Sequence, residues 1–167
     1  MKLLDDPTTW FMKSFPDFPL DPEVTLPTAQ DRFTADAQQP AINDGFIVGF
    51  KRASAPPSPP VGTFVQVTLY LDQFASAGQA ADAVINIFLQ TKALGLLTTI
   101  KIQSQGQTVY IWKPNDHPGL LLFYSSVQLG PDLLSIYGQA SDLTDPQFHE
   151  VAALMIAADN AAVAQAT

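Results

Sequence analysis

The sequence predicts a single soluble α+β domain, in which two amphipathic helices cover a six-stranded antiparallel sheet. Short runs rich in β-branched and aromatic residues alternate with Gly- and Pro-containing turns from residue 45 onward. Two other segments carry apolar residues at helical spacing. A chain of 167 residues fits one domain of ordinary size. The expected order over residues 45–167 is ββαββββα, with consecutive hairpins forming the sheet.

Residues 1–44 are expected to form an N-terminal arm with short helical turns. Ten of the 14 prolines fall in the first 60 residues, and proline disfavours long helices and central strands. One turn is expected from Pro7 through Lys13, and another over residues 28–38, ending before Pro40. Aromatic side chains bury large areas, so the arm should lie on the domain or on another chain. The aromatic residues considered as contacts for a partner protein are Trp10, Phe11, Phe15 and Phe18.

The body begins with two strands and a helix. Residues 45–53 and 63–72 are predicted to pair as a hairpin around a proline-rich loop. A helix is predicted over residues 77–94, opened by a Ser76/Gln79 capping box and closed by Gly95. Its apolar stripe consists of Ala80, Val84, Ile87, Phe88 and Leu94.

Two further hairpins and a closing helix follow. Residues 97–105 and 107–114 flank Gly106, and residues 119–129 and 133–142 flank the turn at 130–132. The last helix is predicted over residues 146–164, with Asp145 as N-cap and Pro146 as its first residue. Its buried stripe is predicted to be Phe148, Val151, Met155, Ala158 and Ala162.

This order of elements resembles the Mog1/PsbP-like fold family. The segments that carry the resemblance are QGQTVYIWKP, LLSIYGQASD and TDPQFHEVAALMIAAD, within residues 45–165. It implies a six-stranded antiparallel sheet with packed helices. The family includes photosystem accessory proteins, a nuclear-transport GTPase partner and bacterial lipoprotein domains. The resemblance therefore implies a binding or assembly role and assigns no functional residue.

Charge and composition exclude several partners. The formal net charge is -8, so phosphate backbones and anionic membranes repel the chain. No apolar run is long enough for a membrane helix. The compartment is left open, and an exported domain whose signal peptide has been removed fits the composition. The acids after Pro114 form either a solvated face or a docking surface for a basic partner; they are Asp116, Asp132, Asp142, Asp145, Glu150 and Asp159.

Catalytic and metal-binding signatures are missing from the sequence. It has no cysteine, no G-x-S-x-G motif and no P-loop. His149 has no ligand-type residue four positions later. We therefore expect no metal and no cofactor, and the sequence names no catalytic residue.

Candidate ligand-binding residues lie on the predicted strands and in one loop. They are Tyr110, Trp112, His117, Tyr124 and Tyr137. Alternate residues Tyr110 and Trp112 share a sheet face, where they form either core or the wall of an apolar pocket. His117 is either a turn residue or a general base beside Asp116.

The sequence thus favours a non-catalytic binding or assembly module that recognises a protein partner or a small hydrophobic ligand. The alternative is an enzyme without a motif, of isomerase or cyclase type, acting in an apolar pocket beside the sheet. A purely structural subunit is a third reading, and the oligomeric state is left open.

Overall fold

The computed structural model describes residues 10–93, 98–114, 117 and 119–166. For residues 88–93 and 98–99 it describes the backbone but not the side chains. Within this part, seven strands form one antiparallel sheet in the order β1-β2-β3-β7-β6-β5-β4. The strands are β1 (Val24–Leu26), β2 (Phe46–Ser54), β3 (Gln66–Phe74), β4 (Thr98–Ser104), β5 (Gln107–Lys113), β6 (Leu120–Leu129) and β7 (Asp132–Ser141). The helices are α1 (Phe11–Ser14), α2 (Ala29–Arg32), α3 (Ala35–Asn43), α4 (Ala77–Ala93) and α5 (Asp145–Ala166).

The α+β class and the antiparallel sheet are confirmed, but the strand count of six and the helix count of two were too low. The additional strand, β1, comes from the N-terminal arm and pairs with Gly49–Lys51 of β2. It has three residues and lies between Pro22 and Pro27. Proline is tolerated beside a short edge strand, where few ladder hydrogen bonds are needed. Such a strand is too short to give a recognisable alternation.

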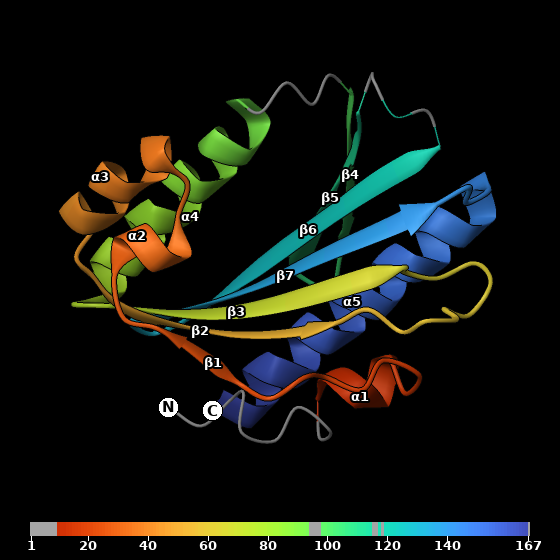
Figure 1. The fold of residues 1–167 in the computed structure, drawn as a ribbon, viewed down its shortest axis with the longest axis horizontal. Coiled ribbons are helices and arrows are strands. Elements are labelled where there is room, and N and C mark those ends of the chain that lie inside the picture. The colour runs from red at the N-terminus through yellow and green to blue at the C-terminus, as the bar shows by residue number, and fades with distance from the viewer. Residues whose placement is uncertain (1–9, 94–97, 115–116, 118, 167) are drawn as a thin grey trace.

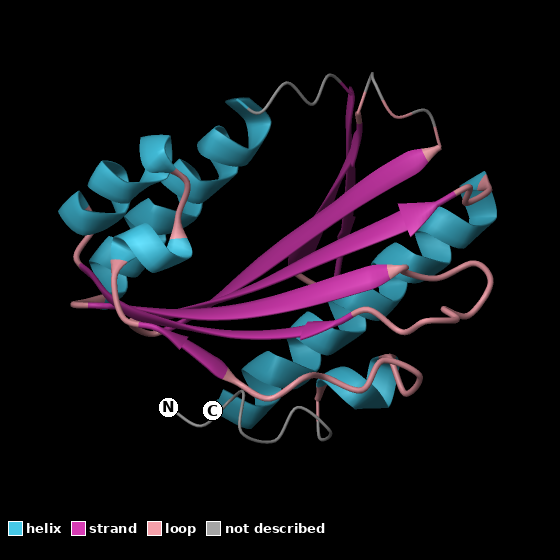
Figure 2. Ribbon diagram, viewed as in Figure 1, coloured by secondary structure: helices cyan, strands magenta, loops and turns pink. Residues whose placement is uncertain are grey.

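The sheet consists of two meanders joined through α4. Strands β1, β2 and β3 run side by side, and β4 to β7 return from the far edge until β7 pairs with β3 (Figure 1). The predicted β2–β3 hairpin is present, and its proline-rich connection forms a loop beyond the end of the sheet (Figure 2). The β4–β5 turn places Gln105 and Gly106 at positive φ, as a tight two-residue hairpin turn requires.

Helices cover both faces of the sheet. Helix α5 contacts β4, β5 and β6 on one face, and α1 packs against α5. Helices α2, α3 and α4 lie together over the opposite face (Figure 1). We call these the α5 face and the α4 face. The predicted α5 stripe is confirmed, since all five of its residues are buried.

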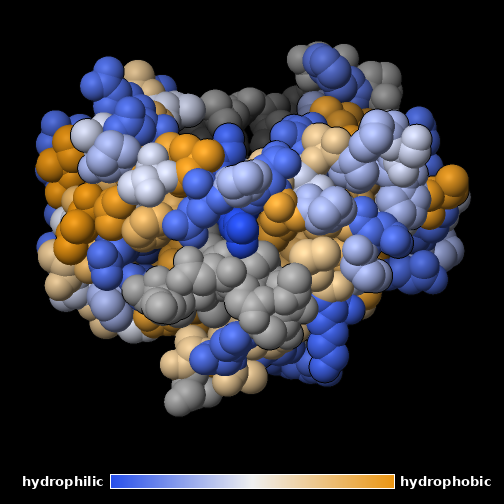
Figure 3. All heavy atoms as spheres, turned by 60° about the horizontal axis from the view of Figure 1, so that its bottom comes forward, coloured by the Kyte–Doolittle hydropathy of each residue, from blue (hydrophilic) through white to orange (hydrophobic). Residues whose placement is uncertain are grey.

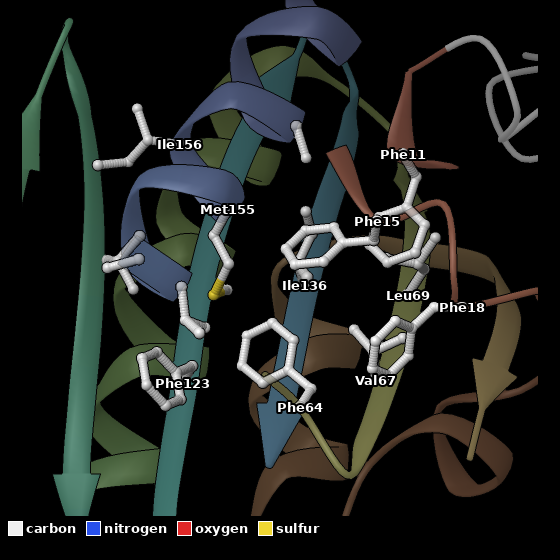
Figure 4. Packing of buried hydrophobic residues seen from close by; sticks show 14 of the residues in the cluster. Phe11, Phe15, Phe18, Phe64, Val67, Leu69, Phe123, Ile136, Met155 and Ile156 are labelled. Atoms are coloured by element: carbon white, nitrogen blue, oxygen red, sulfur yellow. The ribbon is translucent and has the colours of Figure 1, made fainter. Parts of the chain in front are cut away.

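The four aromatic residues proposed as partner contacts are instead core residues of the α5 face. Trp10, Phe11, Phe15 and Phe18 are at most 2% exposed. Phe15 stacks on Phe11 and contacts Phe64, which in turn packs edge-on against Phe123. Figure 4 shows Phe15 and Phe18 pointing toward Leu69 and Ile136 on the sheet. The arm lies on its own domain because its aromatic rings complete this core.

Helix ends differ from the predictions in detail. Helix α3 runs through Pro40 to Asn43, whereas the sequence predicted an end before that proline. The loss of one backbone donor is tolerated because Ala37 and Ala41 are buried where α3 packs on α4. The N-cap of α5 is Thr144, one residue before the predicted Asp145, and its backbone and hydroxyl donate to Gln147. Ser76 caps α4 as predicted, while Phe88, Leu94 and Gly95 lie outside the described side chains.

The acids of the C-terminal half do not form one surface. Asp132 and Asp159 are buried, and Asp142, Asp145 and Glu150 are exposed. Asp116 lies outside the described residues. Figure 3 shows a mostly hydrophilic face on which hydrophobic residues gather toward the end that carries α3. In the described part of the chain, none of the helices combines the length and apolar character needed to cross a membrane.

Candidate ligand-binding site

A row of tyrosines crosses the α4 face of the sheet. Tyr110 on β5 lies directly opposite Tyr124 on β6, and Tyr124 lies opposite Tyr137 on β7. The row continues to Thr68 on β3, which lies opposite Tyr137. Side chains directly opposite on one face of an antiparallel pair are in contact. The antiparallel register therefore brings together residues that are far apart in sequence.

The rings of this row form one continuous aromatic surface. The centroids of Tyr124 and Tyr137 are 4.9 Å apart, and Trp112 stacks on Tyr124 at 5.9 Å. At the other end, Tyr70 meets Tyr137 edge-on at 5.7 Å. These separations lie within the range of favourable aromatic pairs. A flat, largely apolar wall results, in which Trp112 and Tyr124 are buried against Ala80, Ala83 and Ile87 of α4.

An ion pair between Arg32 and Asp72 lies beside Tyr70 at one end of this wall. The Arg32 Nε donates hydrogen bonds to Asp72 Oδ1 at 2.8 Å and to Oδ2 at 3.0 Å, and Nη2 donates to Oδ2 at 2.8 Å. The side chains are 7% and 0% exposed. The guanidinium carbon also lies 3.7 Å from the centre of the Tyr70 ring. A bidentate arginine–carboxylate pair of this kind fixes both side chains.

Local structure holds both partners in place. Arg32 ends α2, whose start is fixed by a capping box between Thr28 and Asp31. Asp72 lies on the central strand β3, opposite Gly49 of β2. A Cβ at residue 49 would lie 2.8 Å from Asp72 Oδ1, so glycine there leaves room for the carboxylate. The pair thereby attaches α2 to the α4 face.

Burial dominates the electrostatics of this site. It raises the pKa of Asp72, while the charge and hydrogen bonds of Arg32 lower it by less. Burial also raises the pKa values of the Tyr124 and Tyr137 hydroxyls. Both phenols are therefore neutral at physiological pH, although the charge of Arg32 lowers the pKa of Tyr137 by a smaller amount.

A cavity of about 370 Å³ lies between this wall and the helices. Its lining includes Tyr70 and Thr68 from β3, Trp112 from β5 and Tyr137 from β7. Helices α2, α3 and α4 contribute Arg32, Ala37 and Ile87, and the connection between α2 and α3 contributes Phe33 and Thr34. The remaining lining residues are Leu122, Phe123, Gly138 and Gln139. The volume and the mixture of rings with a few polar groups are typical of small-molecule sites.

The structure brings together four of the five predicted ligand-binding residues. Trp112 and Tyr137 line the cavity, and Tyr110 and Tyr124 belong to the same tyrosine row. His117 lies elsewhere, in a separate hollow of about 320 Å³ lined also by Lys113 and Asp142. The ligand-binding role of all five stays a prediction.

Sequence reasoning missed the ion pair. Asp72 gave a detectable signal, because it is a charged residue at the end of an otherwise apolar strand pattern. Arg32 gave none, since it lies in the proline-rich arm. Only the fold shows that these residues, 40 positions apart, meet.

A second buried acid lies on the α5 face. Asp159 is 0% exposed, and neither of its carboxylate oxygens has a hydrogen-bond partner in the described part of the chain. Burial raises its pKa to about 7, and the neighbouring Ser125 hydroxyl lowers it by less. Among the described residues, no group of three or more His, Asp or Glu side chains could hold a metal ion.

Comparison with known proteins gives a relationship of fold. No protein-family model matches the sequence, and no curated protein is significantly similar to it. Among solved structures, the extracellular domain of PknH from Mycobacterium tuberculosis is similar, with a TM-score of 0.53 and 10% sequence identity. The alignment covers 93% of this chain and 89% of that one. The chain thus shares its architecture with a bacterial extracellular domain.

Proposed function

We propose that this protein is a non-catalytic binding module that holds a small hydrophobic ligand in the cavity on the α4 face. The observation that carries the proposal is a cavity of about 370 Å³ lined by the rings of Tyr70, Trp112 and Tyr137 from the sheet and of Phe33. Aromatic and aliphatic surfaces provide affinity there, and the few polar groups orient the ligand.

The chemistry of the lining favours binding over catalysis. In the described part of the chain, the cavity lining contains no histidine and no carboxylate. Asp72, which lies next to the lining residue Arg32, is held by three hydrogen bonds from it. A general base must reach its substrate in an ionised, uncommitted form, and the pair with Arg32 withholds Asp72 from that role.

The fold relationship supports a related inference about location. The similar domain of PknH is extracellular, which supports the prediction that this chain is an exported domain. The resemblance to the Mog1/PsbP-like family stays a prediction of the sequence. The similarity to the PknH domain and the resemblance to the Mog1/PsbP-like family both agree with a role in recognition, and neither identifies a partner.

Native mass spectrometry of the purified protein, compared with its denatured mass, tests the proposal. We expect an additional, non-covalently bound mass, or uptake of a hydrophobic probe where the natural ligand has been lost. The fluorescent probe N-phenyl-1-naphthylamine is suitable, because its fluorescence rises in apolar surroundings. Thr68→Trp should abolish uptake, since residue 68 is half-buried in the cavity wall.

A matched variant separates filling of the cavity from general effects of the substitution. Thr25→Trp places the same side chain on an exposed position of the edge strand β1, so probe uptake should be unchanged. If Thr68→Trp melts like the wild-type protein and still binds the probe equally well, the cavity is not the binding site. A wild-type protein that binds neither probe nor natural ligand would contradict the proposed function.

A further inference from the structure

The cavity is electrically balanced although an arginine lines it. Among the described residues, its lining contains one charged side chain, that of Arg32. That charge is matched by Asp72, which lies behind it and is completely buried. The distances of 2.8–3.0 Å leave no room for a third group between them. A ligand in the cavity therefore meets a neutral, strongly bonded pair.

The guanidinium is engaged on its faces as well as at its edge. Its carbon lies 3.7 Å from the centre of the Tyr70 ring and 4.7 Å from that of Phe33. An anionic ligand would have to displace Asp72 from these contacts, and a buried carboxylate without its partner is costly.

A cationic ligand is disfavoured for a different reason. Aromatic rings attract cations through their faces, but Arg32 already occupies the face of Tyr70. A second positive charge would lie beside the first within a buried site, and no carboxylate of the described lining would compensate it.

Uncharged polar groups are available at the same wall. The Thr68 hydroxyl lies opposite Tyr137, and the Gln139 amide follows Tyr137 on the same side of β7. Hydroxyl and amide groups offer both donors and acceptors. They can pair with a hydroxyl or carbonyl group of a ligand without requiring that it be charged.

We propose that the natural ligand of this cavity is an uncharged molecule built on flat rings, with a hydroxyl or carbonyl group that bonds to Thr68 or Gln139. The rings of the ligand lie against Tyr137, Trp112 and Phe33, which line the cavity from both the sheet and the helices. This inference rests on the proposed function, because it describes the ligand of the same cavity.

Two probes that differ only in charge test this selectivity. N-Phenyl-1-naphthylamine is neutral, and 8-anilino-1-naphthalenesulfonate is the same ring system with a sulfonate. We expect the wild-type protein to bind the neutral probe at least about tenfold more tightly by fluorescence titration, because the sulfonate finds no free positive charge. Thr68→Trp should remove the bound fraction of both probes, which locates them in the cavity.

Removing the negative charge of Asp72 should invert the preference. Asp72→Asn leaves Arg32 charged and partly unpaired, so the affinity for the sulfonate probe should rise about tenfold or more. The affinity for the neutral probe should change by less than about threefold. Asp82→Asn is the matched control, because it changes the net charge by the same amount at an exposed position of α4. It should alter neither affinity.

The outcomes separate this inference from the proposed function. If the wild-type cavity binds the sulfonate probe as tightly as the neutral one, the inference is wrong while the binding function stands. If a folded Asp72→Asn protein shows no gain for the sulfonate, Asp72 is not what excludes anions. If that variant does not fold, the wild-type comparison alone decides. Binding of neither probe would overturn both proposals.

Discussion

The two faces of the sheet bury their side chains in different ways. On the α5 face, helix α5 and the arm fill the space with apolar groups, and Phe15, Phe64 and Phe123 form a chain of ring contacts. On the α4 face, Trp112 and Tyr124 pack with residues of α4 in a second buried cluster, and a cavity of about 370 Å³ lies beside it, lined by Tyr70 and Tyr137. The α5 face buries the larger apolar cluster, and the α4 face combines a smaller cluster with the cavity that Tyr70 and Tyr137 line.

Under the proposed function, the α4 face holds the ligand, while the α5 face contributes to stability alone. A filled apolar core stabilises through buried area and close packing. A cavity forgoes those contacts, so a face that retains one needs other attachments between its layers. The pair of Arg32 and Asp72 provides such an attachment, because it ties α2 to the central strand β3 beside the cavity.

The largest expected effect comes from breaking that attachment. Arg32→Met leaves Asp72 buried without its counter-charge, and we expect a loss of about 3–5 kcal/mol in the free energy of unfolding at neutral pH. Urea denaturation measures it. The loss should shrink in acid, because burial already raises the pKa of Asp72 and its neutral form does not need the arginine.

Two companion variants show whether the lost charge or the lost contact is responsible. The double variant Arg32→Met/Asp72→Leu replaces the pair by apolar groups and should recover most of the stability. Arg52→Met removes an arginine that donates to the backbone carbonyl of Asp21 at a more exposed position. It should cost less than about 1 kcal/mol. A double variant as unstable as Arg32→Met would show that shape, rather than charge, governs this position.

The buried carboxyl of Asp159 interrupts the apolar packing of the α5 face, and we expect it to make the free energy of unfolding depend on pH. Burial raises the pKa of Asp159 from 3.8 to about 7. The neutral carboxyl is the form that suits the folded protein, so its contribution to stability is complete below about pH 4. That contribution is lost as the pH rises toward 7, which lowers the free energy of unfolding by up to about 4 kcal/mol.

Asp159→Asn should remove this dependence. The variant should be more stable than the wild-type protein at pH 8 and similar to it at pH 4, as measured by thermal and urea denaturation across that range. Glu150→Gln changes an exposed acid of the same helix and should leave the pH profile unaltered. A wild-type profile that is flat between pH 4 and pH 8 would contradict the raised pKa.

The sequence was informative where a local pattern decides the structure. The hairpin turns at Gly106 and Gly130 and the stripe of α5 follow from short-range periodicity and turn chemistry. Strand β1 was not predicted, because three residues are too few to show the alternation of a strand. The continuation of α3 through Pro40 was not predicted, because packing against α4 outweighs the tendency of proline to end a helix.

The site was foreseeable only in part, for a related reason. Alternation assigned Tyr110 and Trp112 to one face, but it left open whether they form core or the wall of a pocket. Which face would be filled and which would be hollow depends on where the helices and the arm pack. That is a property of long-range contacts such as β3 with β7. The pairing of Arg32 with Asp72 likewise depends on the position of α2 and on no nearby motif.

Neighbouring leucines on β6 give the smallest and most direct comparison of the two faces. Leu121 is buried in the α5 core, where it also borders the hollow near His117, and Leu122 points the opposite way and lines the cavity. Leu121→Ala should cost about 2–5 kcal/mol, because its side chain is 5% exposed, and Leu122→Ala about 1–2 kcal/mol, because its side chain is only partly buried. Urea denaturation measures both losses, and titration with N-phenyl-1-naphthylamine should show weaker binding for Leu122→Ala alone. Equal losses with unchanged binding would mean that the two faces are packed alike, since the same methyl groups would then lose the same number of neighbours on either side of the strand.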